Sequence, residues 1–64
     1  MFPFEVGDRV LVKGEDGLWA KPEDGIWTVT KIENGTIRLE KGKMWRYVAP
    51  HMITKYKPEK ERML

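Results

Sequence analysis

The sequence predicts an all-β domain, and three observations support this fold class. Three consecutive runs are rich in β-branched and aromatic residues, which favour strands: residues 26–32, 36–40 and 44–48. Asn34 and Gly35 separate the first two runs and favour a tight hairpin turn, because both residues tolerate positive φ. Apolar Ile37 and Leu39 alternate with polar neighbours, as in a strand that has one buried and one solvated face. We therefore predict a three-stranded antiparallel meander at the centre of the fold.

Two further strands flank the meander. Residues 9–13 form the first strand, with Val10 and Val12 on one face, and residues 53–56 form a short last strand. We expect the core to consist of aliphatic side chains at alternating or central strand positions: Val10, Val12, Val29, Ile37, Leu39, Val48 and Ile53.

The connections between the strands differ in length. Residues 14–25 form a long first connection, and its Trp19 is a large apolar side chain that we expect to pack against the core. Gly42 permits a second tight turn in the meander, because glycine tolerates positive φ. Pro50 has no N–H to donate to a strand ladder, so we expect residues 49–52 to form a single helical turn before the last strand.

Together these elements describe a small five-stranded SH3-like barrel over residues 1–57. Full or partial closure would protect the edge strands that an open sheet of this size exposes. An OB-like barrel is the alternative, but it usually has a helix between its third and fourth strands, for which this sequence has no room. Residues 58–64 are highly charged and are expected to form a tail that frays or begins a helix.

Length and composition limit the functions open to this chain. Its 64 residues form one domain that buries only about 60% of its unfolded surface, which leaves no room for a separate catalytic cleft. The sequence has no cysteine, no serine and one histidine, His51, so a thiolate metal site and a Ser-His-Asp set are both excluded. No apolar run approaches the roughly 20 residues of a membrane span. We expect a domain that is not an enzyme by itself and that binds no metal, cofactor or membrane.

Positive charge is concentrated in the second half of the chain. Residues 1–32 hold four Lys or Arg and six Asp or Glu, whereas residues 33–64 hold eight and four. Six basic residues accompany only one acidic residue in the stretch that they span: Arg38, Lys41, Lys43, Arg46, Lys55 and Lys57. We expect the strands and their turn to bring these cations to one end and one face of the sheet, where they bind phosphates. A surface whose charges only keep a small domain soluble is the alternative.

The aromatic residues of the third meander strand leave two arrangements open. Trp45 and Tyr47 alternate with Met44, Arg46 and Val48, so one of these two sets faces the core. If Val48 faces the core, the two rings are exposed beside the basic residues and can stack on bases. If the rings face the core, they contribute packing alone. The aromatic residues could also form a cage for a methylated lysine, as in Tudor and chromo-like readers.

A family resemblance extends over about residues 5–58. It rests on four segments and their order: GDRVLVK at 7–13, WTVTKI at 27–32, TIRL at 36–39 and WRYVAPHMITKYKP at 45–58. In these features the chain resembles the C-terminal domain of retroviral and retrotransposon integrases, although it has Asp24-Gly25-Ile26 where that family commonly has Gly-Pro. The resemblance implies an SH3-like barrel that binds DNA and forms multimers, in an integrase whose catalytic carboxylates lie in another domain.

The sequence therefore predicts a module that binds nucleic acid without sequence preference, as an accessory domain of an integrase-like protein. DNA is the expected partner, RNA remains open, and so does a homo-oligomer. The alternatives are a peptide- or chromatin-binding module with an aromatic cage, and a multimerisation module with an apolar sheet face. The absence of cysteine favours an intracellular, reducing compartment, and an integrase role implies the nucleus.

Overall fold

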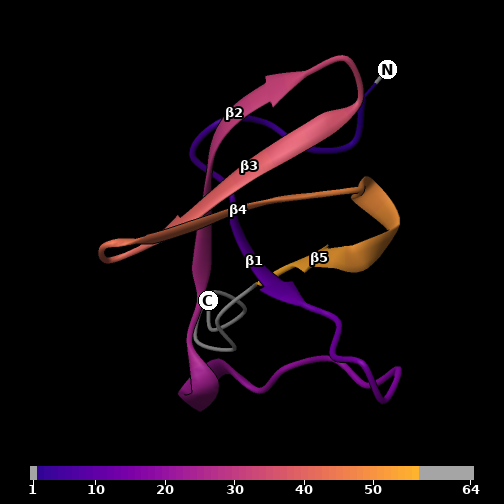
Figure 1. Cartoon of the computed structure of the whole chain (residues 1–64), viewed down its shortest axis with the longest axis vertical. Coiled ribbons are helices and arrows are strands. Elements are labelled where there is room, and N and C mark those ends of the chain that lie inside the picture. The colour runs from indigo at the N-terminus through magenta and orange to yellow at the C-terminus, as the bar shows by residue number, and fades with distance from the viewer. Residues whose placement is uncertain (1, 57–64) are drawn as a thin grey trace, which may run out of the picture.

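The computed structural model describes residues 2–56, and these form one antiparallel five-stranded sheet. The elements along the chain are β1 (Arg9–Val12), η1 (Pro22–Asp24), β2 (Trp27–Glu33), β3 (Thr36–Lys41), β4 (Met44–Val48), η2 (Pro50–Met52) and β5 (Ile53–Lys55), where η denotes a single 3₁₀ turn. The strands pair in the order β4-β3-β2-β1-β5 (Figure 1). The all-β class, the five strands and the helical turn before the last strand are thus confirmed.

Two tight turns fold the chain back on itself in the β2–β3–β4 meander. Asn34 and Gly35 have φ values of 52° and 78°, and the residues on either side of them pair across the hairpin. Positive φ at both central positions is the signature of a type I′ turn, whose twist matches that of the flanking strands. Gly42, with φ of 62°, begins the second turn. Both predicted turns are confirmed.

Strand β2 connects the two halves of the sheet. Its first two residues, Trp27 and Thr28, pair with β1, and the strand pairs with β3 from Thr28 to Glu33 except at Thr30. The register shifts between Val29 and Lys31, as at a β-bulge, which bends a strand and increases its twist. Beyond β1, strand β5 adds three paired residues, so that segments from the two ends of the described chain lie side by side (Figure 1).

The sheet does not close into a complete barrel. Within residues 2–56, β4 and β5 are the two edges of the ladder, and they do not pair with each other. The turn η2 carries the chain from β4 to β5, which pairs with β1 over only three residues. The structure therefore shows an open five-stranded sheet where the sequence predicted a barrel.

The core lies on one face of the strands, and all seven side chains expected there are buried. Phe4 is an eighth buried residue that the sequence did not predict, because it lies beside Pro3 in a segment without strand periodicity. Backbone hydrogen bonds hold this segment in place: the Gly7 N–H donates to the Val29 carbonyl oxygen, and the Val29 N–H donates to that of Asp8, at 2.8 and 2.9 Å.

Trp19 is not part of the core, and that prediction is wrong. Its side chain is 44% exposed, and its backbone forms a bridge opposite Lys13, just beyond the end of β1. Opposite residues point to the same face, and Lys13 follows the inward-facing Val12 and points outward. The Lys13 Nζ lies 5.7 Å from the centroid of the Trp19 ring, so the ring packs beside a lysine. The predicted tail at 58–64 lies outside the described residues.

Candidate nucleic-acid interface

Strand β4 is exposed along most of its length. Val48 is buried, whereas the four preceding residues of the strand are all exposed. Trp45 and Tyr47 are 57% and 49% exposed, respectively. This answers the question that the alternation left open: Val48 faces the core, and the two rings face solvent. We call residues 43–47, which comprise the exposed part of β4 and the lysine of its turn, the β4 surface.

The cross-strand pairs assign each side chain of β4 to a face of the sheet. Trp45 lies opposite Glu40, and Tyr47 lies opposite Arg38, so these four residues share the outer face. Arg46 lies opposite the buried Leu39 and points to the other face, at the open edge of the sheet. Arg38 and Arg46 therefore point in opposite directions, and the expected gathering of the cations on one face is wrong.

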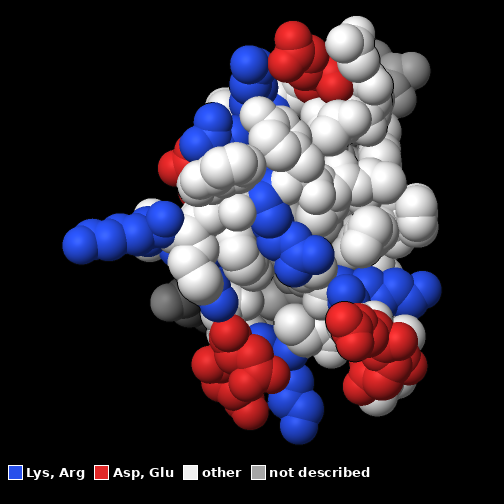
Figure 2. Space-filling view, in the orientation of Figure 1, with Lys and Arg blue, Asp and Glu red and all other residues white. Residues whose placement is uncertain are grey.

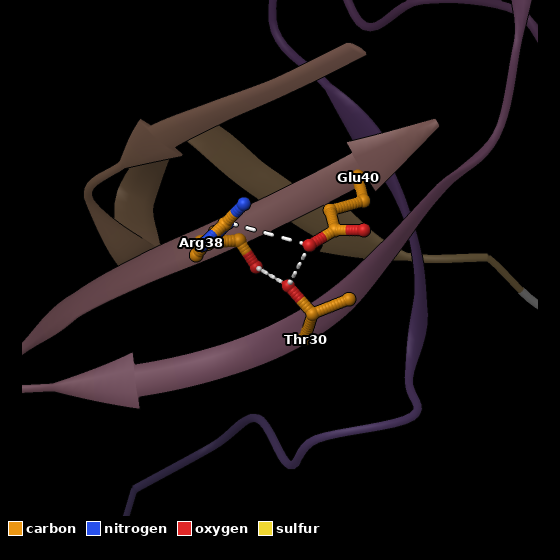
Figure 3. A network of polar contacts seen from close by, with 3 residues as sticks. All are labelled: Thr30, Arg38 and Glu40. Atoms are coloured by element: carbon orange, nitrogen blue, oxygen red, sulfur yellow. Dashed lines mark hydrogen bonds and ion pairs between the residues drawn. The ribbon is translucent and has the colours of Figure 1, made fainter. Parts of the chain in front are cut away.

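A polar network on the outer face holds Arg38 in position (Figure 3). The Arg38 Nε lies 3.3 Å from the Glu40 Oε2, and the guanidinium carbon lies 4.9 Å from the centroid of the Trp45 ring. The Thr30 hydroxyl lies 3.3 Å from the same carboxylate oxygen and 3.4 Å from the Arg38 carbonyl oxygen, and its one proton serves one acceptor at a time. The Nε is buried and lacks an aligned hydrogen bond, so its contact with Glu40 is an ion pair only.

Trp45 and Tyr47 form an aromatic corner beside this network. Their ring centroids are 5.8 Å apart, and their planes meet at 82°. The pair is two residues apart on one strand, so both rings project from the same face. The corner thus offers two ring surfaces at nearly a right angle, next to the guanidinium of Arg38.

Two of the other predicted cations are engaged away from this face. The Lys41 Nζ donates a hydrogen bond to the Asp24 carbonyl oxygen at 3.4 Å and lies 5.0 Å from the centroid of the Trp27 ring. The Lys55 Nζ lies 3.6 Å from the Asp8 Oδ2, at the opposite edge of the sheet from β4.

Among the predicted cations that the structure describes, Lys43 and Arg46 are the two that are exposed and remain free of ion pairs within residues 2–56. Lys57, the sixth predicted cation, lies outside the described residues. Sequence reasoning also passed over Met44, which is exposed between these two cations, because an apolar residue in a strand gives no signal of exposure.

Most acidic side chains of the visible face gather at its lower end (Figure 2). Blue side chains are spread over much of this face, and most of the red ones form two groups at its lower end, where Figure 1 draws the connection between β1 and β2. This connection holds four carboxylates: Glu15, Asp16, Glu23 and Asp24. An anionic partner would therefore avoid the β1–β2 connection and favour the side of β4 and its turn.

The three tryptophans lie in separate places, each beside its own cation. Trp19 contacts Lys13, Trp27 contacts Lys41, and Trp45 contacts Arg38. Trp27 lies opposite the buried Val10 and so faces the core side, whereas Trp45 is on the outer face. A cage for a methylated lysine needs several rings around one cation, and the described tryptophans do not provide this arrangement.

Residues 2–56 contain neither a pocket nor a group of three or more His, Cys, Asp or Glu side chains that could hold a metal ion. No helix in the same range is long and apolar enough to cross a bilayer. The candidate site is the exposed strand surface itself. Comparison of the chain with protein-family models, curated proteins and solved structures gives no match.

Proposed function

We propose that the chain is a nucleic-acid-binding module whose contact region is the β4 surface. One observation carries the proposal: an edge strand and its turn expose Lys43 and Arg46, free of ion pairs within residues 2–56, together with Trp45 and Tyr47. Cations bind the phosphates of a nucleic acid irrespective of its sequence, and exposed rings stack on its bases or sugars. Both kinds of contact are available on five consecutive residues of an edge strand and its turn, where Arg46 points to one face of β4 and the two rings point to the other.

The proposed fold is a partly open SH3-like barrel. The strand order β4-β3-β2-β1-β5, the bent β2 shared between two halves and the 3₁₀ turn before β5 support this assignment. Together with the sequence motifs, they support an accessory domain that resembles the C-terminal domain of integrases. In such a protein the catalytic residues would lie in another domain, and this one would hold DNA or RNA.

The structure lowers the number of phosphate contacts expected of this surface. The sequence suggested six cations, whereas two of the described ones are exposed and unpaired. Each phosphate contact with duplex DNA contributes about −0.9 to the slope of log affinity against log salt concentration. Two contacts give a slope of about −2, and weak binding of roughly 10⁻⁴–10⁻⁶ M is expected.

Reversal of both charges, Lys43→Glu with Arg46→Glu, should abolish most of this binding without unfolding the domain. Both side chains are exposed, so their replacement leaves the core intact. The matched control is Lys13→Glu with Lys21→Glu, which changes the net charge equally at exposed positions outside the β4 surface. Fluorescence anisotropy with a labelled duplex at several salt concentrations measures the affinity and the slope for each variant.

Equal losses in the two double variants would show that binding follows net charge rather than the β4 surface. The absence of binding to DNA and RNA at low salt would refute the proposed function.

An unpaired edge strand also favours a second candidate, multimerisation through β4. Edge strands present free N–H and C=O groups that can pair with a strand of another chain, and the exposed apolar side chain of Met44 favours such contact. Arg46 lies at the middle of β4, so antiparallel pairing of two copies about this point would bring two like charges together. This repulsion opposes the pairing of β4 with a second copy of itself. Sedimentation equilibrium of the free protein separates this candidate from nucleic-acid binding.

A further inference from the structure

The β4 surface has few free cations and a large exposed aromatic area. Lys43 and Arg46 are its charged residues, whereas Trp45 and Tyr47 are each about half exposed. On the adjoining outer face, both β2–β3 cations are paired with carboxylates: Lys31 with Glu33 and Arg38 with Glu40. Phosphate attraction alone therefore gives this surface little affinity, and the rings are its main remaining source of binding energy.

The geometry of the aromatic corner limits what can bind there. The two rings are 5.8 Å apart at 82°, so two bases lying in parallel planes cannot stack on both of them. One planar group can lie flat on one ring and place its edge against the other. Arg38 lies over part of Trp45, yet that side chain remains 57% exposed, so ring surface is still open for stacking.

A base within a duplex cannot occupy this corner, because both of its faces are covered by the neighbouring base pairs. An unpaired base has a free π-face, and stacking on an aromatic side chain accepts any base. Lys43, in the turn before β4, can contact a flanking phosphate, whereas Arg46 points to the opposite face and meets a phosphate only where the bound strand crosses the free edge of β4. This edge also offers N–H and C=O groups to the edge of the base.

We infer that the β4 surface binds single-stranded nucleic acid in preference to duplex, with one unpaired base held at the Trp45–Tyr47 corner. This inference rests on the proposed function and names its substrate class. Stacking of one base contributes a factor of roughly 5 to 150 in affinity. The preference for the single strand should lie in this range.

The test uses three labelled ligands of one length, about 12 nucleotides, which is within the site size typical of small β-barrels. They are a single strand without self-complementarity, the same strand annealed to its complement, and an abasic strand with the same sugar-phosphate backbone. Anisotropy titrations at low salt give the Kd of each. The single strand should bind at least about 5-fold more tightly than the duplex or the abasic strand.

Two substitutions connect this preference to the corner. Trp45→Ala should raise the Kd for the single strand to the level of the duplex and leave the Kd for the duplex nearly unchanged. Tyr47→Ala should reduce the preference in the same direction. Trp19→Ala is the matched control, because it removes another exposed tryptophan far along the chain and should change neither Kd.

Equal or tighter binding of the duplex would overturn the inference while leaving the proposed function in place. So would a Trp45→Ala variant that loses affinity for all three ligands by the same factor. If that variant does not fold, as judged by circular dichroism, Tyr47→Ala and the abasic strand decide the question. Failure of all three ligands to bind would instead refute the proposed function itself.

Discussion

Leu39→Ala should lower the free energy of unfolding by about 2–5 kcal/mol, the cost of removing a large aliphatic side chain from a packed core. Leu39 is fully buried at the centre of β3, between Val29 on one neighbouring strand and β4 on the other. A domain of this size has a total stability of only about 3–10 kcal/mol, so the variant should be partly or wholly unfolded at room temperature. Urea denaturation followed by circular dichroism measures the loss.

Leu18→Ala is the matched control for this substitution. It makes the same chemical change at a side chain that is 68% exposed, and surface changes of this kind usually alter stability by less than about 0.5 kcal/mol. A loss at Leu39 as small as that at Leu18 would mean that the register of β3 is shifted by one residue. Such a shift would turn Leu39 toward solvent.

Gly25→Ala should lower the stability by about 1–3 kcal/mol, the usual cost of a strained backbone at a non-glycine residue. Gly25 has φ of 124° and ψ of 135°, a region that side chains rarely permit. A Cβ there would also meet the flexible end of the Lys41 side chain, which would move aside and withdraw its ammonium from the Asp24 carbonyl oxygen. Thermal and urea unfolding of the variant measure the combined cost.

Two further variants separate the cost of the backbone strain at Gly25 from the cost of the contact with Lys41. In a Lys41→Ala background, Gly25→Ala should cost less, because only the backbone strain remains. Gly17→Ala provides a strained position with open space, since φ is 83° and nothing lies within 4 Å of the added Cβ. An unchanged cost in the Lys41→Ala background would show that the Lys41 side chain moves aside at little cost and that backbone strain accounts for the whole loss.

Most of the fold could be predicted because its signals are local. Asn34-Gly35 and Gly42 mark turns through backbone conformations that few other residues adopt, and both have positive φ in the structure. Between these turns, Ile37 and Leu39 alternate with polar residues, and this pattern correctly predicted which face of β3 is buried. Closure of the sheet depends instead on how its two edges meet, and no local pattern in the sequence specifies that.

The site was predicted less well, because it depends on cross-strand register and on partners distant in the chain. Arg38 and Arg46 lie on adjacent strands, yet the register places them opposite Tyr47 and Leu39, respectively, and so on different faces. Lys41 binds a carbonyl group 17 residues away along the chain. Such contacts withdraw cations from the surface, and the charge count of a sequence cannot show them.

Trp19 was misplaced for a similar reason. Apolarity alone suggested that its ring would be buried, but the backbone of the β1–β2 connection pairs with the end of β1. The Ala20 N–H donates to the Val12 carbonyl oxygen at 2.9 Å, and the Gly14 N–H donates to that of Leu18 at 2.8 Å. These backbone hydrogen bonds hold the Trp19 side chain in its outward direction. Their stabilisation outweighs the gain from burying the apolar ring.

The placement of function on β4 can be tested directly by NMR, from the backbone amide shifts of the whole chain as an unlabelled single strand is added. We expect the largest changes at residues 43–47 and at Arg38, whose guanidinium adjoins the corner, with the β1–β2 connection unaffected because of its four carboxylates. Changes centred on residues 14–25 or on β5, with β4 unperturbed, would contradict the assignment of the interface to the β4 surface.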